Sequence, residues 1–123
     1  MAEALLKNLA SDRFEAYSAG LNPGTLNPLA VSAMQEMNID ISHQQTKSVL
    51  QMQQLGNFDY VISVCDESVD QACPVWPGKA RKLHWPFADP SKFQGEFAER
   101  LKKTIRVRDQ IKMKITEWLK TNP

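Results

Sequence analysis

The pattern of apolar and polar residues predicts helices that alternate with short strands. Helical spacing of apolar residues, with turn and proline signals at the ends, predicts helices at Met1–Ala10, Pro28–Asn38, Ser48–Leu55 and Glu96–Leu119. Alternating or continuous apolar runs predict strands at Arg13–Gly20, Tyr60–Cys65 and Arg81–Trp85. Because the Tyr60–Cys65 run is apolar on both faces, it suits a parallel strand covered by helices. The sequence therefore predicts an α/β sandwich with a parallel sheet.

The last predicted helix carries a long apolar stripe that should face the core. Its members are Phe97, Leu101, Ile105, Ile111, Ile115, Trp118 and Leu119. The first predicted helix is unusual in a different way, because no Ser, Thr, Asp or Asn precedes it as a cap. A helix that begins at residue one has the appearance of a cut end.

Composition narrows the classes of function. The 123 residues suffice for one domain, 1–123, and a net charge of +1 gives no basic footprint for nucleic acid. No apolar run is long enough to span a membrane, and two cysteines are too few for a disulfide scaffold. We therefore expect a globular cytoplasmic protein without nucleic-acid or membrane partners and without a cofactor.

The two cysteines, Cys65 and Cys73, are the clearest candidates for chemistry. A zinc site would need His43 and His84 as further ligands, and their spacing fits no known finger. Two buried, inert thiols are a second interpretation. Against it, Cys65 ends a predicted strand, where open α/β sheets bind ligands. A disulfide across so short a loop is worth about 2.5 kcal/mol, small enough to be made and broken by exchange. The redox interpretation is favoured.

Three segments also resemble a known family. They are FEAYSAGLNPGTLNPLAVSAMQEMNIDIS, FDYVISVCDESVDQACPVWPGKARKLHWPFADPS and RVRDQIKMKI. Over essentially the whole chain they are similar to thioredoxin-coupled arsenate reductases, which share the fold of low-molecular-weight protein tyrosine phosphatases. The resemblance implies a three-layer sandwich with a flavodoxin-like sheet of order 2-1-3-4, and a relay of three thiols. Cys65 matches the second thiol, Cys73 the third, and Asp89 the general acid. Arsenate and thioredoxin are the implied partners.

Two further positions depart from the common pattern of that family. The spacing of eight from Cys65 to Cys73 replaces the more usual seven. Glu3 and Ser18 match ligands of a monovalent cation that some relatives bind, whereas Lys47 stands where those relatives have a carboxylate. Either the ammonium of Lys47 replaces the ion, or Lys47 is an ordinary solvated lysine.

The resemblance also bears on the start of the chain. In the family, a first strand leads into a Cys-x5-Arg-Ser loop that binds the oxyanion, and Met1 matches a position just after that loop. We therefore expect the first strand, the first thiol and the loop arginine to be missing from these residues, and the chain by itself to be inactive. A start codon or boundary placed too late and a true relative without the loop both remain open.

Three functions follow as hypotheses. The first is an arsenate reductase in its intact form. The second is a non-catalytic oligomer that keeps the fold, and the third, less favoured, is a phosphatase-like hydrolase. Since an interior strand is worth on the order of 10 kcal/mol, its absence predicts a two-fold homodimer. Direct pairing of the strands at Arg13–Gly20 and Tyr60–Cys65 within one chain is the runner-up.

Overall fold

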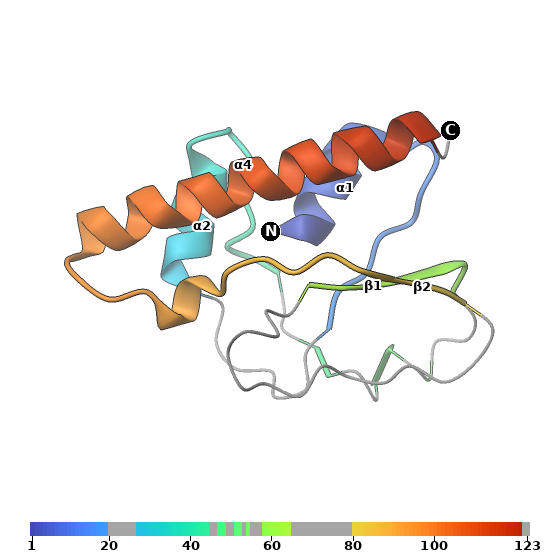
Figure 1. The fold of residues 1–123 in the computed structure, drawn as a ribbon, viewed down its shortest axis with the longest axis horizontal. Helices are drawn as coiled ribbons and strands as arrows, with labels where there is room; N and C mark the ends of the chain where they lie inside the picture. Colours follow the sequence, from blue (N-terminus) through green and yellow to red (C-terminus); the bar gives the residue numbers. More distant parts are fainter. Residues whose placement is uncertain are drawn as a thin grey trace.

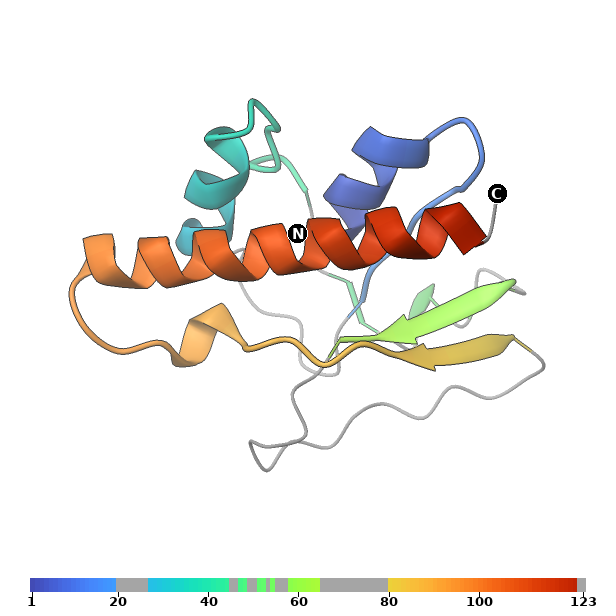
Figure 2. The same cartoon turned by 45° about the horizontal axis from the view of Figure 1, so that its top comes forward.

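Three helices lie on one side of two parallel strands (Figures 1 and 2). The computed structural model describes residues 1–19, 27–44, 47–48, 51–52, 54, 58–64 and 80–121. In chain order the elements are α1 (Ala2–Ala10), α2 (Pro28–Gln35), β1 (Tyr60–Ser63), β2 (Arg81–His84), the 3-10 turn η1 (Pro90–Lys92) and α4 (Phe97–Thr121). None of the helices in the described part of the chain is long and apolar enough to cross a membrane. The predicted α/β class is confirmed.

The helix α1 forms where the apolar spacing predicts it. Met1 occupies the N-cap position without a side-chain hydrogen bond, and its carbonyl accepts from the backbone N–H of Leu5 at 3.0 Å. Leu5 is 1% exposed and Ala10 likewise, so the apolar stripe of α1 faces the core. Packing against α4, rather than a cap, therefore holds this helix.

The helix α2 has a strong start signal and a sharp end. The side chain of Asn27 accepts from the backbone N–H of Leu29 at 2.9 Å, and Pro28 fits the first helical position. The helix ends at Gln35, three residues before the predicted end at Asn38. Asn38 has a φ of 61°, a left-handed conformation that asparagine tolerates and that closes a helix.

The sheet is parallel, as predicted. β1 pairs with β2 in a register that places Tyr60 opposite Arg81 and Ser63 opposite His84. Each strand is shorter than its predicted range, and Cys65 lies outside the described residues. Half of the predicted helix Ser48–Leu55 also lies outside them, and residues 51 and 52 are helical.

The predicted strand at Arg13–Gly20 is wrong within its described part, residues 13–19. These residues form a turn and then an irregular segment, and no backbone hydrogen bond joins them to β1 among the described residues. The apolar members are used for ring packing instead: Phe14 lies 6.4 Å from Tyr60 and 5.1 Å from Trp118 between ring centroids. Alternation alone does not make a strand, because a strand also needs a neighbour to pair with.

The long helix α4 packs against both α1 and α2 (Figure 1). Its buried face carries Thr104, Val107, Arg108, Ile111, Ile115 and Leu119. Phe97, predicted to belong to the apolar stripe, is 47% exposed. Because it is the first residue of α4, it lies before the part of the helix that packs against α1 and α2.

One buried cation, Arg108, joins α4 to the end of α2. Its Nη1 donates to the carbonyl of Ala33 at 2.8 Å and lies 3.2 Å from Oε1 of Glu36. Its Nε and Nη2 both donate to Oδ1 of Asp109. The side chain is 7% exposed, so these contacts compensate for the removal of its charge from water.

Candidate functional site

The carboxyl edge of the sheet is where the sequence places the candidate chemistry, and the structure describes β1 and β2 up to that edge. The ladder continues beyond the strands, since the backbone N–H of Trp85 donates to Ser63 at 2.8 Å and that of Phe87 to Val64 at 3.4 Å. Val64 is joined directly to Cys65 in the chain. Cys65 and Cys73 both lie outside the described residues, so their pairing stays a prediction.

Asp89 lies in the loop that leaves this same edge. It is half-buried, and its carbonyl accepts from the backbone N–H of Lys92 at 3.0 Å as η1 begins. The 3-10 turn contacts α4, which fixes the far end of the loop. The described loop therefore carries Asp89 on a segment anchored at both ends.

Aromatic packing fixes the near end of that loop. Trp85 is 8% exposed, and its ring lies 5.8 Å from the ring of Trp118 on α4. The ammonium of Lys114, also on α4, lies 5.8 Å from the Trp85 ring centroid. Because Trp85 immediately follows His84, this packing sets where β2 ends and the loop begins.

A cross-strand pair at this edge was missed by reasoning from the sequence, which gave His84 little weight. Oγ of Ser63 lies 2.7 Å from Nδ1 of His84 and also donates weakly to the carbonyl of Leu83 at 3.4 Å. The available signal was positional: both residues end parallel strands, and the register pairs them. Register is set by tertiary packing, so the pairing could not be read from spacing alone.

A second cluster surrounds the buried carboxylate of Glu3 on α1. Ser18 donates to Oε1 of Glu3 at 2.7 Å, and Lys7 donates to Oε2 at 3.1 Å. The ammonium of Lys47 lies 3.7 Å from Oε1. The Glu3 side chain is 6% exposed. The structure therefore brings together the three residues that the resemblance groups and adds Lys7, whose (i, i+4) spacing from Glu3 was visible in the sequence.

The electrostatics of this cluster favour an ionised Glu3. Burial acts to raise the pKa of the Glu3 carboxyl. Hydrogen bonds from Ser18 and Lys7, together with the positive charge of Lys47, outweigh burial and hold the pKa below its ordinary value of 4.5. The folded chain thus binds this proton less tightly than the unfolded chain, and the cluster stabilises the fold whenever Glu3 is charged.

We predict that Glu3→Gln lowers the free energy of unfolding by about 1–3 kcal/mol at pH 7, since Lys47 and Ser18 lose their charged acceptor. The contribution of ionised Glu3 to the free energy of unfolding is complete above about pH 4.5. It disappears as the pH falls through the pKa of Glu3 in the folded chain, which is lower. Urea unfolding between pH 7 and pH 3 measures both effects. The exposed α4 substitution Glu117→Gln is the control. If the free energy of unfolding of Glu3→Gln depended on pH in the same way as that of the parent chain, this account would be contradicted.

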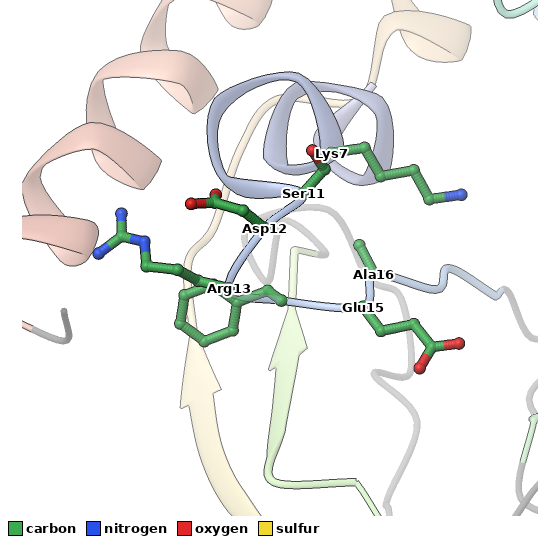
Figure 3. A pocket seen from close by; sticks show the side chains of 7 residues that line it. Lys7, Ser11, Asp12, Arg13, Glu15 and Ala16 are labelled. Carbon is green, nitrogen blue, oxygen red and sulfur yellow. The ribbon is translucent and has the colours of Figure 1, made fainter.

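An open pocket of about 570 Å³ lies at the opposite end of α1. It is lined by Lys7, Ser11, Asp12, Arg13, Phe14, Glu15 and Ala16. Figure 3 shows the side chain of Arg13 pointing to the opposite side from those of Lys7 and Glu15. The pocket therefore offers no convergent set of groups for a ligand. Across the described residues, no three His, Cys, Asp or Glu side chains are placed to hold a metal ion.

Comparisons with known proteins give a consistent result. The family model for low molecular weight phosphotyrosine protein phosphatase matches residues 1–122. The chain is 41% identical over 121 residues to the arsenate reductase of Shouchella clausii (strain KSM-K16) and 39% identical over 121 residues to that of Bacillus subtilis (strain 168). Each alignment covers 98% of this chain and 86% of the relative.

Solved structures agree with the sequence relatives. An arsenate reductase in the intermediate state superposes with a TM-score of 0.72 at 26% identity, covering 99% of this chain and 87% of that one. An arsenate reductase in reduced state gives a TM-score of 0.71 at 25% identity with the same coverage. The layered arrangement in Figures 1 and 2 is thus shared with these proteins across nearly the whole chain.

Proposed function

Because the chain belongs to the low molecular weight phosphotyrosine protein phosphatase family, we propose that it carries the thiol-exchange part of an arsenate reductase. Cys65 is the thiol that displaces arsenite, and Cys73 is the thiol that closes the final disulfide. Arsenate is the substrate and a dithiol protein of the thioredoxin class is the reductant. A disulfide that is reopened in every cycle suits a reducing compartment such as the cytoplasm.

One observation carries this proposal. The relatives that share 36–41% of their residues with the chain over 121 residues are arsenate reductases, although the family model itself is that of a phosphatase. A hydrolase of this fold needs no second or third thiol, whereas the matched segment here contains Cys65 and Cys73. The phosphatase alternative explains neither cysteine.

The proposed chemistry balances through three thiols. A nucleophilic thiolate outside these two cysteines bonds to the arsenic of arsenate, and water leaves. The Cys65 thiolate attacks the sulfur of that adduct, so arsenic takes two electrons and departs as arsenite while a disulfide forms. Cys73 then attacks Cys65, freeing the first thiol and leaving a Cys65–Cys73 disulfide for the reductant. Asp89 supplies the proton to the departing oxygen.

The test uses the chain in two forms. By itself it should show no arsenate turnover, because the relay needs three thiols and these residues contain two. A chimera that carries, ahead of Met1, the first strand and Cys-x5-Arg-Ser loop that the family resemblance implies should then turn over with thioredoxin, its reductase and NADPH. Asp89→Asn should slow the chimera about 100-fold. Turnover that persists in the chimera after Cys65→Ser would refute the roles proposed.

We also propose that the ammonium of Lys47 takes the place of a bound monovalent cation beside Glu3 and Ser18. The support is the 3.7 Å distance between Lys47 Nζ and Glu3 Oε1 in a cluster whose carboxylate is almost fully buried. Lys47→Met should make the melting temperature rise with potassium, while the parent chain stays insensitive. Lys7→Met, on the more exposed side of the same carboxylate, is the control. Equal potassium responses of parent and Lys47→Met would reject the replacement.

A further inference from the structure

Positive charge is concentrated on α4. The helix carries 8 Lys or Arg residues against 3 Asp or Glu residues, which is a net charge of +5. The rest of the chain carries 7 Lys or Arg residues against 11 Asp or Glu residues, which is a net charge of −4. The net charge of +1 for the whole chain therefore hides a strong separation of charge. Because α4 runs along much of the fold (Figures 1 and 2), its charge forms an extended band.

One side of α4 points away from the core. The buried residues Thr104, Ile111 and Ile115 define the inner side of the helix. On the opposite side, exposed residues recur every three or four positions, as the helical period requires. We call these residues the outer stripe, and they are Lys102, Arg106, Asp109, Met113, Glu117 and Lys120.

The cations of the outer stripe are not neutralised by neighbouring carboxylates. Oδ1 of Asp109 already accepts from Nε and Nη2 of the buried Arg108, at 3.0 Å and 2.8 Å. Among the residues that the structure describes, no carboxylate forms an ion pair with Lys102, Arg106 or Lys120. Their positive charge is therefore available to an acidic partner.

An apolar side chain lies within the same stripe. Met113 is 65% exposed, more than the exposed Tyr17, Val64 and Phe97. A methionine side chain is flexible and polarisable, so it adapts to an irregular apolar contact on a partner. The outer stripe thus combines cations on both sides of Met113 with one apolar anchor.

We propose that the outer stripe of α4 is a docking surface for an acidic segment of a partner protein. Carboxylates of the segment pair with Lys102, Arg106 and Lys120, and an apolar side chain between them covers Met113. Opposite charges across such a surface steer the encounter and select the partner. This docking is separate from the proposed thiol chemistry, because it uses none of the residues assigned to the reductase.

Two other classes of anionic partner fit the outer stripe less well. A helix that binds a membrane surface turns its apolar face toward the lipid, whereas the apolar face of α4 packs in the core. A nucleic-acid backbone presents only negative phosphates, and the carboxylate of Glu117 would face them. A protein segment can match both signs of charge and also an apolar side chain, so the outer stripe favours a protein.

Fluorescence anisotropy of a labelled acidic peptide tests the proposal. The probe is a fluorescein-labelled peptide of Glu interspersed with Leu, and the parent chain should bind it at low salt. Raising the salt to about 0.2 M should weaken the affinity about tenfold, because exposed charges are screened. Lys102→Glu/Arg106→Glu should lower the low-salt affinity about tenfold by replacing attraction with repulsion. Met113→Ser should lower it about threefold through loss of the apolar contact.

A matched control separates the outer stripe from net charge. Arg13→Glu/Lys82→Glu, at exposed positions outside α4, changes the net charge by the same amount and should leave the affinity unchanged. Equal losses in the two double variants would overturn the proposal, as would equal affinities of Lys102→Glu/Arg106→Glu and the parent chain. Tighter binding to phosphatidylserine vesicles or to duplex DNA than to the peptide would also overturn it. Because neither thiols nor arsenate take part, the result is independent of the reductase proposal.

Discussion

The oxidised chain is expected to lose both of its free thiols to one intramolecular disulfide between Cys65 and Cys73. The two cysteines are eight residues apart, and closing such a loop contributes about 2.5 kcal/mol, so the bond forms under mild oxidant and remains reducible. Thiol titration should fall from 2 per chain to none, at a rate independent of protein concentration.

Single substitutions give this prediction its sharpest form. Cys65→Ser and Cys73→Ser should each abolish the intramolecular bond completely and leave one titratable thiol under the same oxidant. Peptide mapping of oxidised monomer identifies the linked segments. Bridges found only between chains, or two thiols that survive oxidation, would eliminate the redox interpretation and return the pair to inert cysteines.

The second prediction with a large expected effect concerns the mass of the protein in solution. We expect the 14.0 kDa chain to form a two-fold dimer. β1 pairs with β2 along one edge, and within the described residues no backbone hydrogen bond crosses its other edge. The direct pairing of residues 13–19 with β1, the alternative arrangement, is not formed in the described part of the chain. Tyr17 and Val64, near this edge, are 44% and 41% exposed. A strand edge that has no backbone hydrogen bond among the described residues, beside apolar surface, favours association.

Light scattering over a dilution series measures the association. The weight-average mass should be about twice 14.0 kDa at high concentration and fall on dilution. Tyr17→Lys should shift the dimer toward monomer, because it places a charge beside the open edge. Met113→Lys, at a position 65% exposed on the outer face of α4, should not. A compact, stable monomer at micromolar concentration would refute the dimer.

Local signals predicted most of the helical fold. Asn27 and Pro28 mark the start of α2, and the buried stripe of α4 follows the helical period from Val107 to Leu119. Errors occurred where long-range pairing decides. Residues 13–19 alternate like a strand but have no partner strand among the described residues. The end of α2 depended on a left-handed Asn38, which the apolar pattern does not report.

The candidate site shows the same difference between what the sequence predicts and what long-range packing decides. The resemblance grouped Glu3, Ser18 and Lys47, although 29 positions separate Ser18 from Lys47, and the structure places both beside the same carboxylate. The Ser63–His84 pair went unnoticed because it depends on the register of two strands whose partners are 21 residues apart in the chain. Arg108 likewise interrupts an apolar stripe, and its burial is explained by contacts that the stripe does not report, among them the carbonyl of Ala33 across the helix interface.

The central claim is that Cys65 and Cys73 form the disulfide that a thioredoxin reopens. In the direct measurement, oxidised chain is mixed with a catalytic amount of thioredoxin, with thioredoxin reductase and with NADPH. The absorbance of NADPH is followed until it stops changing. The account predicts one NADPH consumed per oxidised chain, recovery of 2 free thiols, and no consumption by Cys65→Ser. NADPH consumption that is undiminished in Cys65→Ser, or an oxidised chain that thioredoxin leaves intact, would contradict it.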